Sequence, residues 1–298
     1  MLEQIITIIA PVLICVCLGI VWTRSGAPFD SAFVARIVFY VGIPTLLISR
    51  FSEIDIAPTV LGQTTLLAVG LQAAMALIGY VLVKLGKKDA SIYLPPLIFG
   101  NNGNMGIPLC FLAFGDEGMA MALCFFVVLM IAQATFGIAI VNVNAGGFKD
   151  RMIYLFSQPI IYATAISVLI MITDYELPRW LGETIHLLSG ISIPLMLIAL
   201  GTSLAGIGLK TIKDSIGFSL LRVGIGFLLG WLTIELLQLE GVLRGVILIQ
   251  AAMPSAIFNY LLALRYERDP KQVASLIVSS TAISFVTLPL LLTLALKG

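Results

Sequence analysis

The sequence predicts an all-α integral membrane protein of ten transmembrane helices, in two inverted five-helix repeats with crossed broken helices (spans four and nine). Three observations predict this fold class. Of the 298 residues, 59% are hydrophobic and only 11% are charged, whereas a soluble domain carries roughly 25% charged residues. Ten apolar runs each have a length close to that of a membrane helix, which needs about 20 residues. Features of the first half also recur about 150 residues later in the chain.

The apolar runs take up most of the chain, and short charged connectors separate them. We expect spans over residues 4–22, 31–50, 60–83, 91–113, 117–141, 153–173, 181–204, 213–236, 241–264 and 272–296. Ten spans place alternate connectors on opposite sides, with twelve Lys and Arg on one side and four on the other. The positive-inside rule puts the richer side in the cytoplasm. We therefore expect a multi-pass protein of the cell inner (plasma) membrane with both termini extracytoplasmic.

The two halves resemble each other at a common offset. Gly-Ile-Pro44 in the second span matches Ser-Ile-Pro194 in the seventh, and the same offset places Asn104 on Pro254. Five spans per half is an odd number, so the second half enters the membrane from the opposite side. Inverted repeats with broken helices are typical of secondary transporters. The repeats that we expect are residues 1–145 and 151–298.

A polar break interrupts the fourth span at residues 99–108, Phe-Gly-Asn-Asn-Gly-Asn-Met-Gly-Ile-Pro. Gly and Pro loosen the helical hydrogen-bond ladder, and Asn amides need partners in hydrocarbon. A second break follows in the ninth span, at residues 250–259. Paired breaks in corresponding spans indicate the binding site of a transporter. The helix-break residues that we expect are Gly100, Gly103, Gly106, Pro108 and Pro254.

The residues of the two breaks suit a carboxylate. A half-helix that resumes near residues 105–108 presents free N–H groups and a positive partial charge, which favour an anion. The substrate-binding residues that we expect are Asn101, Asn102, Asn104, Pro254, Ser255, Asn259 and Arg222. In the alternative interpretation, the Asn side chains only cap the broken ends and join the two helices.

Arg222 is the one cation well inside a predicted span. Charge within a membrane is costly and indicates function, so Arg222 could pair with an anionic substrate or stabilise the C-terminus of a half-helix. The sequence slightly favours a third interpretation, in which the side chain extends to the cytoplasmic interface. Gln72, Gln133 and Gln250 fit interhelical hydrogen bonds better than substrate ligands.

Other classes of function find no support in the sequence. No catalytic or ATP-binding motif is present, so we expect no enzyme. A single histidine, His186, excludes a site of several His ligands, and we expect no metal and no cofactor. The net charge of +1 and the lack of a basic run argue against nucleic acid. Gly226-x-x-x-Gly230 fits close helix packing, within the chain or between subunits. Two alternative functions stay open: a channel or uniporter for a neutral solute, and a ligand sensor with a transporter fold.

The sequence resembles the auxin efflux carrier family, which includes plant auxin carriers and bacterial relatives. The resemblance rests on residues 101–109 and 250–255, on Tyr266-Glu267-x-x-Pro270 and on Thr287-Leu-Pro289-Leu290. It implies that spans 1, 2, 6 and 7 form a scaffold that often dimerises. It also implies that spans 3–5 and 8–10 form a transport domain that moves by an elevator mechanism.

The resemblance also carries a function to particular residues. Asn101 matches the Asn that meets the substrate carboxylate in the family, and Pro254 matches the proline of the ninth span. Gly100 stands where the plant carriers have a proline, so the backbone of the break can differ. The resemblance implies a secondary transporter or facilitator of organic anions in the lipid bilayer, with carboxylates such as malate, malonate or auxin-like acids as substrates.

Overall fold

The computed structural model describes residues 2–297 except 54–55, 142–147, 174 and 207–211. Its described residues form helices, three π-helical turns and a single isolated antiparallel bridge between Gly100 and Ser255, without any strand. The elements are α1 (Leu2–Arg24), α2 (Ser31–Ile37), η1 (Val38–Gly42), α3 (Ile43–Glu53), α4 (Pro58–Leu85), α5 (Ala90–Ile98), η2 (Asn102–Gly106), α6 (Ile107–Ala132), η3 (Gln133–Gly137), α7 (Ile138–Val141), α8 (Phe148–Phe156), α9 (Pro159–Thr173), α10 (Arg179–Ser189), α11 (Ser192–Gly206), α12 (Ile212–Leu237), α13 (Gly241–Ala251), α14 (Phe258–Arg265) and α15 (Pro270–Ala295).

Seven helical stretches among the described residues are long and apolar enough to cross a membrane. They are Glu3–Arg24, Phe33–Phe51, Pro58–Leu85, Asn102–Val141, Arg179–Ala205, Ser215–Leu237 and Pro270–Ala295, and Pro159–Thr173 and Gly241–Ala251 are shorter apolar helices. The predicted all-α membrane protein is therefore confirmed. The predicted boundary at residue 145 lies outside the described residues.

The longest of these stretches turns back on itself. Its 40 residues would measure about 60 Å as one straight helix, roughly twice the hydrocarbon thickness of a bilayer. Gly115 interrupts it with φ +64° and ψ −149°, a conformation that favours glycine. The residues before Gly115 continue from the first polar break, and the residues after it form a separate helical segment.

Large apolar side chains cover the outside of the helices. Leu66 on α4, Leu236 on α12 and Val286 on α15 are among the most exposed, at 74%, 78% and 81%. Exposed apolar surface on this scale is unfavourable in water and is stable against lipid. The chain is thus a multi-pass membrane protein.

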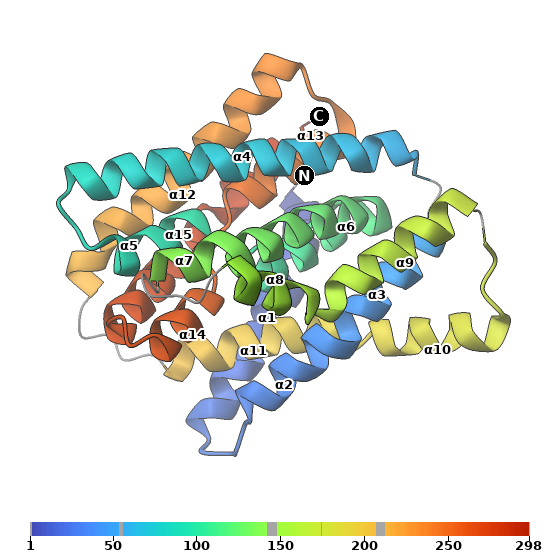
Figure 1. The fold of residues 1–298 in the computed structure, drawn as a ribbon, viewed down its shortest axis with the longest axis horizontal. Helices are drawn as coiled ribbons and strands as arrows, with labels where there is room; N and C mark the ends of the chain where they lie inside the picture. The colour runs from blue at the N-terminus through green and yellow to red at the C-terminus, as the bar shows by residue number, and fades with distance from the viewer. Residues whose placement is uncertain (1, 54–55, 142–147, 174, 207–211, 298) are drawn as a thin grey trace.

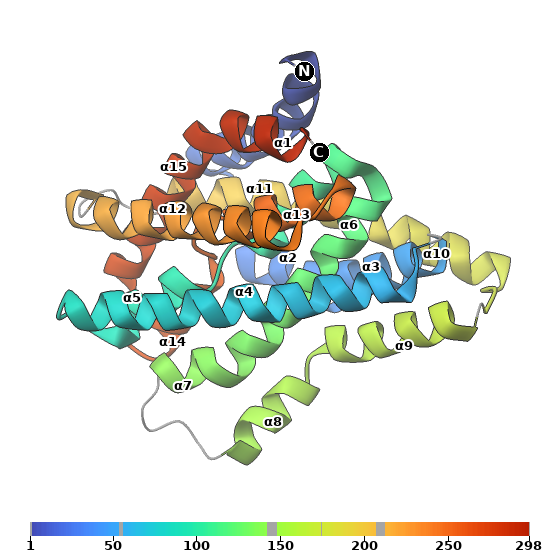
Figure 2. The ribbon, with the colours of Figure 1, turned by 90° about the horizontal axis from the view of Figure 1, so that it is seen from above.

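The helices pack in two groups. In one group, α1 runs along α11, and α3 packs on α9 and α10; α3 and α9 lie side by side in both views (Figure 1, Figure 2). Gly201 allows the α1–α11 contact, because an added β-carbon would lie 2.0 Å from the carbonyl oxygen of Val16. In the other group, α4 packs on α5 and α6, and α12 packs on α13 and α15.

The Gly226-x-x-x-Gly230 motif packs within the chain. A β-carbon added to Gly226 would lie 2.1 Å from the carbonyl oxygen of Ala251, and one added to Gly230 would lie 3.0 Å from the Ala251 side chain. These glycines therefore hold α12 directly against the end of α13, next to the second polar break.

Substituting Gly226 tests this contact. Gly226→Ala should lower the free energy of unfolding by about 1–3 kcal/mol, because the added methyl group has no space. Gly224→Ala on the same helix is the matched control, since nothing lies within 4 Å of its added β-carbon. Melting temperatures of the purified variants check this. Equal melting temperatures for both variants would show that the contact is not tight.

Candidate functional site

The two polar breaks lie against each other in the centre of the second group of helices. The chain leaves helical geometry after α5 and after α13, and the two extended stretches run antiparallel. The backbone N–H of Asn101 donates to the carbonyl oxygen of Pro254 at 2.7 Å, and the N–H of Ala256 donates to that of Phe99 at 3.0 Å. These two bonds satisfy backbone groups that hydrocarbon would leave unpaired.

Asn102 joins the breaks instead of facing open space. Its Nδ2 donates to the backbone oxygen of Gln250 at 2.8 Å and to the side-chain Oε1 at 2.7 Å. The Nε2 of Gln250 in turn donates to the Sγ of Cys110 at 3.6 Å. For Asn102, the geometry therefore fits the alternative in which an Asn side chain ties the broken helices together.

Ser255 and Asn259 also take part in the crossing. The Nδ2 of Asn259 donates to the carbonyl oxygen of Phe99 and to the Oγ of Ser255, both at 3.1 Å. The backbone N–H of Ser255 donates to the Oγ of Ser280 at 3.1 Å. Both side chains are buried, and Asn259 joins the second break to the first through the carbonyl of Phe99.

The three glycines of the first break are places of close approach. The approaching groups are side chains. An added β-carbon would lie 2.2 Å from Arg222 Nη2 at Gly100, 2.6 Å from Phe126 Cε2 at Gly103 and 2.5 Å from Gln250 Oε1 at Gly106.

The helix after the first break resumes earlier than expected. The sequence suggested residues 105–108, but the π-helical turn η2 already begins at Asn102 and leads into α6. Pro108 is the second residue of α6, and because η2 runs directly into α6, its missing N–H removes one hydrogen bond from a continuous helical run.

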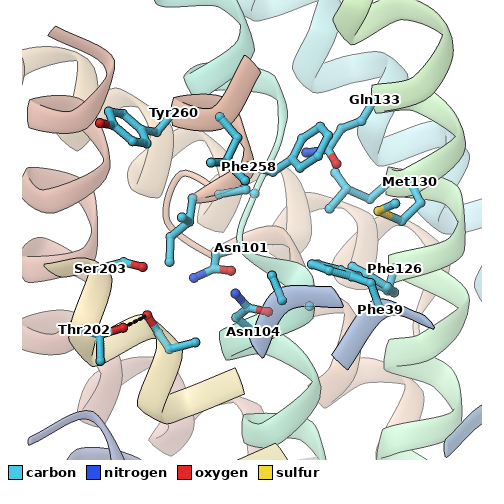
Figure 3. Close-up of a pocket in the computed structure, with 18 residues that line it drawn as sticks. Phe39, Asn101, Asn104, Phe126, Met130, Gln133, Thr202, Ser203, Phe258 and Tyr260 are labelled. Atoms are coloured by element: carbon cyan, nitrogen blue, oxygen red, sulfur yellow. Dashed lines mark hydrogen bonds between the residues drawn. The ribbon is translucent and has the colours of Figure 1, made fainter. Parts of the chain in front are cut away.

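A cavity of about 570 Å³ lies beside the crossing (Figure 3). Its walls come from α2 and η1, from the first break and η2, from α6 and η3, from α11, and from the second break and α14. The residues that line it are Ala35, Phe39, Gly100, Asn101, Gly103, Asn104, Phe126, Leu129, Met130, Gln133, Ala199, Thr202, Ser203, Ala256, Ile257, Phe258, Tyr260 and Leu261. None of these lining residues carries a charge.

Each of the three π-helical turns contributes to this cavity. Phe39 lies on η1, Asn104 on η2 and Gln133 on η3. Each turn closes with a hydrogen bond from a backbone N–H to the carbonyl five residues earlier. Such turns are rare and are frequently found at functional sites.

Two amide groups in the cavity lining lack partners. The side chains of Asn101 and Gln133 are 3% and 2% exposed, and neither Asn101 Nδ2 nor Gln133 Nε2 has a hydrogen-bond partner among the described residues. An unpaired buried donor costs about 1–3 kcal/mol, which makes these two nitrogens candidate donors to a ligand. Asn104 also points into the cavity, and Thr202 and Ser203 lie across from it (Figure 3).

The rest of the wall is largely apolar. The rings of Phe39 and Phe126 stack with centroids 6.2 Å apart, and Phe258, Met130 and Leu261 add further apolar surface. The cavity therefore suits a molecule with an apolar body and a head group that accepts hydrogen bonds.

Sequence reasoning missed part of this lining. Gln133 was expected to form an interhelical hydrogen bond, as Gln72 does with the carbonyl oxygen of Ile98 at 3.2 Å. Thr202 and Ser203 form a polar pair inside an apolar span, and this pair is the feature of the sequence that indicates their place in the lining.

The interface position suggested for Arg222 is wrong. The side chain is only 5% exposed, and its guanidinium donates to the backbone oxygens of Met253 at 3.0 Å, Leu97 at 2.9 Å and Ile98 at 3.5 Å. The geometry fits a role at the C-termini of the half-helices. Arg222 does not line the large cavity.

Substitutions of Asn102 and Asn104 distinguish a side chain that ties the two breaks together from one that points into the cavity. Asn102→Ala should lower the free energy of unfolding by about 1–3 kcal/mol, because it removes two buried hydrogen bonds and leaves the Oε1 of Gln250 without its donor. Asn104→Ala is the control and should keep the melting temperature, since no hydrogen bond of its side chain is formed within the described part of the chain. Thermal unfolding of both variants checks this, and the reverse order would contradict the assignment.

Comparison with known proteins agrees with this picture. A family model described as membrane transport protein matches residues 4–292. An uncharacterized transporter of Methanocaldococcus jannaschii is 25% identical over 271 residues, which cover 86% of each chain. An uncharacterized transporter of Methanothermobacter thermautotrophicus is 26% identical over 292 residues, which cover 94% of each chain. With its polar breaks in contact and the family model matched over nearly its whole length, the chain belongs to the membrane transport proteins of the auxin efflux carrier family.

Proposed function

We propose that this chain is a secondary transporter or facilitator of organic anions, and that its substrate binds in the cavity beside the crossing. One observation carries the proposal. The amide donors of Asn101 and Gln133 are buried and unpartnered within the described structure, and both border a largely apolar cavity. A carboxylate accepts hydrogen bonds from several such donors at once.

The proposed substrate has one carboxylate and an apolar body. The amides of Asn101, Asn104 and Gln133 line one cavity and are the proposed donors to the head group, and the stacked rings of Phe39 and Phe126 would cover the body. A dicarboxylate such as malate is less well matched, because no charged residue of the described lining offsets its second charge.

The proposed mechanism is an elevator movement. The scaffold would comprise α1, α2, η1, α3 and α8–α11, and the transport domain would comprise α4–α7 and α12–α15, in ten crossings and two inverted repeats. The packing supports this division. The contact of α1 with α11 lies within the scaffold, and the contact of α12 with α15 lies within the transport domain. The cavity lies where the groups meet, since Phe39 and Thr202 face the polar break that holds Asn101.

The proposal includes the expected setting of the protein. We place it in the cell inner membrane with both termini extracytoplasmic, on the basis of the Lys and Arg distribution. We also propose a homodimer through the scaffold helices. Exposed apolar residues such as Trp180 and Leu187 on α10, at 71% and 75%, are compatible with either lipid or a second subunit.

A neutral solute is the second candidate substrate. The observation that favours it is the lack of charge among the described residues of the lining. A primary amide of the same shape as the acid can accept hydrogen bonds from the same donors. Comparing each acid with its amide therefore decides between the two candidates.

Thermal stabilisation of the purified protein tests the binding site. Ligands that bind the folded state raise the melting temperature, so we would compare acetate, malonate, malate, phenylacetate and phenylacetamide. Phenylacetate should stabilise the protein most. Asn101→Ala and Gln133→Leu should each weaken binding about tenfold or more, because each removes a donor to a charged group. Gly224→Ala is the control that should bind as wild type.

Counterflow in proteoliposomes tests transport itself. Labelled phenylacetate should accumulate against unlabelled phenylacetate inside, and Asn101→Ala should abolish the accumulation. If phenylacetamide stabilises the protein and phenylacetate does not, the substrate is a neutral solute and the proposal of an anion is wrong. Wild-type binding and transport by Asn101→Ala would show that the substrate binds elsewhere.

A further inference from the structure

Arg222 occupies the point where the ends of two half-helices meet. It lies on α12, and its guanidinium spans from the last carbonyls of α5 to the carbonyl of Met253, just after α13. Ile98, one of the carbonyl partners on α5, also accepts a hydrogen bond from Gln72. The side chain thus ties three helices at one buried position.

The charge of this guanidinium is not offset by a carboxylate. No Asp or Glu forms an ion pair with Arg222 among the residues that the structure describes. Its partners are backbone carbonyls, and each helix C-terminus carries roughly half a negative charge. The two C-termini at the crossing therefore account for about one negative charge, against one full positive charge on Arg222.

The remaining helix ends at the crossing are positive. The helices that resume after the breaks, through η2 into α6 and at α14, present their N-termini there. In the absence of Arg222, the two C-termini and two N-termini would offset one another. The guanidinium makes the sum positive, beside a cavity whose described lining is uncharged.

Gly100 lies next to this charge and also lines the cavity. A β-carbon added to it would lie 2.2 Å from Arg222 Nη2. The cation thus lies directly behind the wall that carries Asn101. A charge in a site of low dielectric acts over such a distance without contact.

We propose that Arg222 is the residue that makes the cavity selective for anions. It acts through the wall at Gly100, and it positions the crossing through its three carbonyl partners without touching the substrate. The inference deepens the proposed function and rests on it, because it assigns the preference for a carboxylate to a residue outside the cavity.

The test compares an acid with its amide. Affinities for phenylacetate and phenylacetamide are measured by thermal stabilisation, with malonate and malonamide as a second pair. Wild type should prefer the acid, and Arg222→Gln should lower this preference about tenfold or more, since the fixed charge is lost. Arg244→Gln is the matched control: Arg244 also donates to a backbone carbonyl, that of Leu294 at 2.8 Å, but lies away from the crossing.

Arg222→Lys separates charge from positioning. Lys keeps the charge but not the planar group that binds several carbonyls, so this variant should keep the preference for the acid while its melting temperature falls. If Arg222→Gln does not fold, Arg222→Lys decides alone: loss of the preference in a folded Lys variant would overturn the inference.

The outcomes distinguish the inference from the proposed function. A wild type that prefers the acid, together with an unchanged preference in Arg222→Gln, overturns the role of Arg222 and leaves the anion transporter standing. A wild type that binds the amide as tightly as the acid overturns the anion transporter, and the inference with it. A lower acid preference in Arg222→Gln and a wild-type preference in Arg244→Gln support the inference.

Discussion

The structure depends on satisfying backbone polar groups where two helices are broken inside an apolar protein. An unbroken span places its unpaired end groups outside the hydrocarbon, but α5 and α13 end in the interior, where their last carbonyls need partners from the protein. The isolated bridge at Gly100 and Ser255 meets part of this need. The side chains of Gln72 and Arg222 donate to the carbonyls of Ile98 and Leu97 at the end of α5, and Asn259 adds a second donor to the carbonyl of Phe99.

This requirement explains why polar residues near the breaks divide into two sets. Asn102, Gln250 and the amide nitrogen of Asn259 form hydrogen bonds within the protein and hold the crossing in one geometry, although the buried Oδ1 of Asn259 has no partner among the described residues. Asn101 and Gln133 are equally buried but keep donors without partners in the described structure. The first set fixes the crossing, and the second leaves donors beside the cavity that nothing in the described structure occupies.

The sequence revealed the membrane fold and both breaks, because composition, apolar runs and Gly, Pro and Asn in hydrocarbon are local signals. It could not separate Asn102 from Asn104, since neighbouring amides differ only in which way the local turn directs them. The position of Arg222 was equally hidden: counting residues from the interface does not show that carbonyls of two other helices lie within reach. The position of Gln133 in the cavity lining could not be predicted, because the sequence does not show which helix faces the cavity.

Because of the π-helical turns, the lining of the cavity is sensitive to the deletion of single residues. Each turn holds one residue more than an α-helical turn would, so deleting that residue would restore regular geometry and rotate everything beyond it by about 100°. The helical residues that follow each turn would then face new directions with no change in their identity. Insertions and deletions of single residues within spans are therefore a direct route by which such carriers can diverge in specificity.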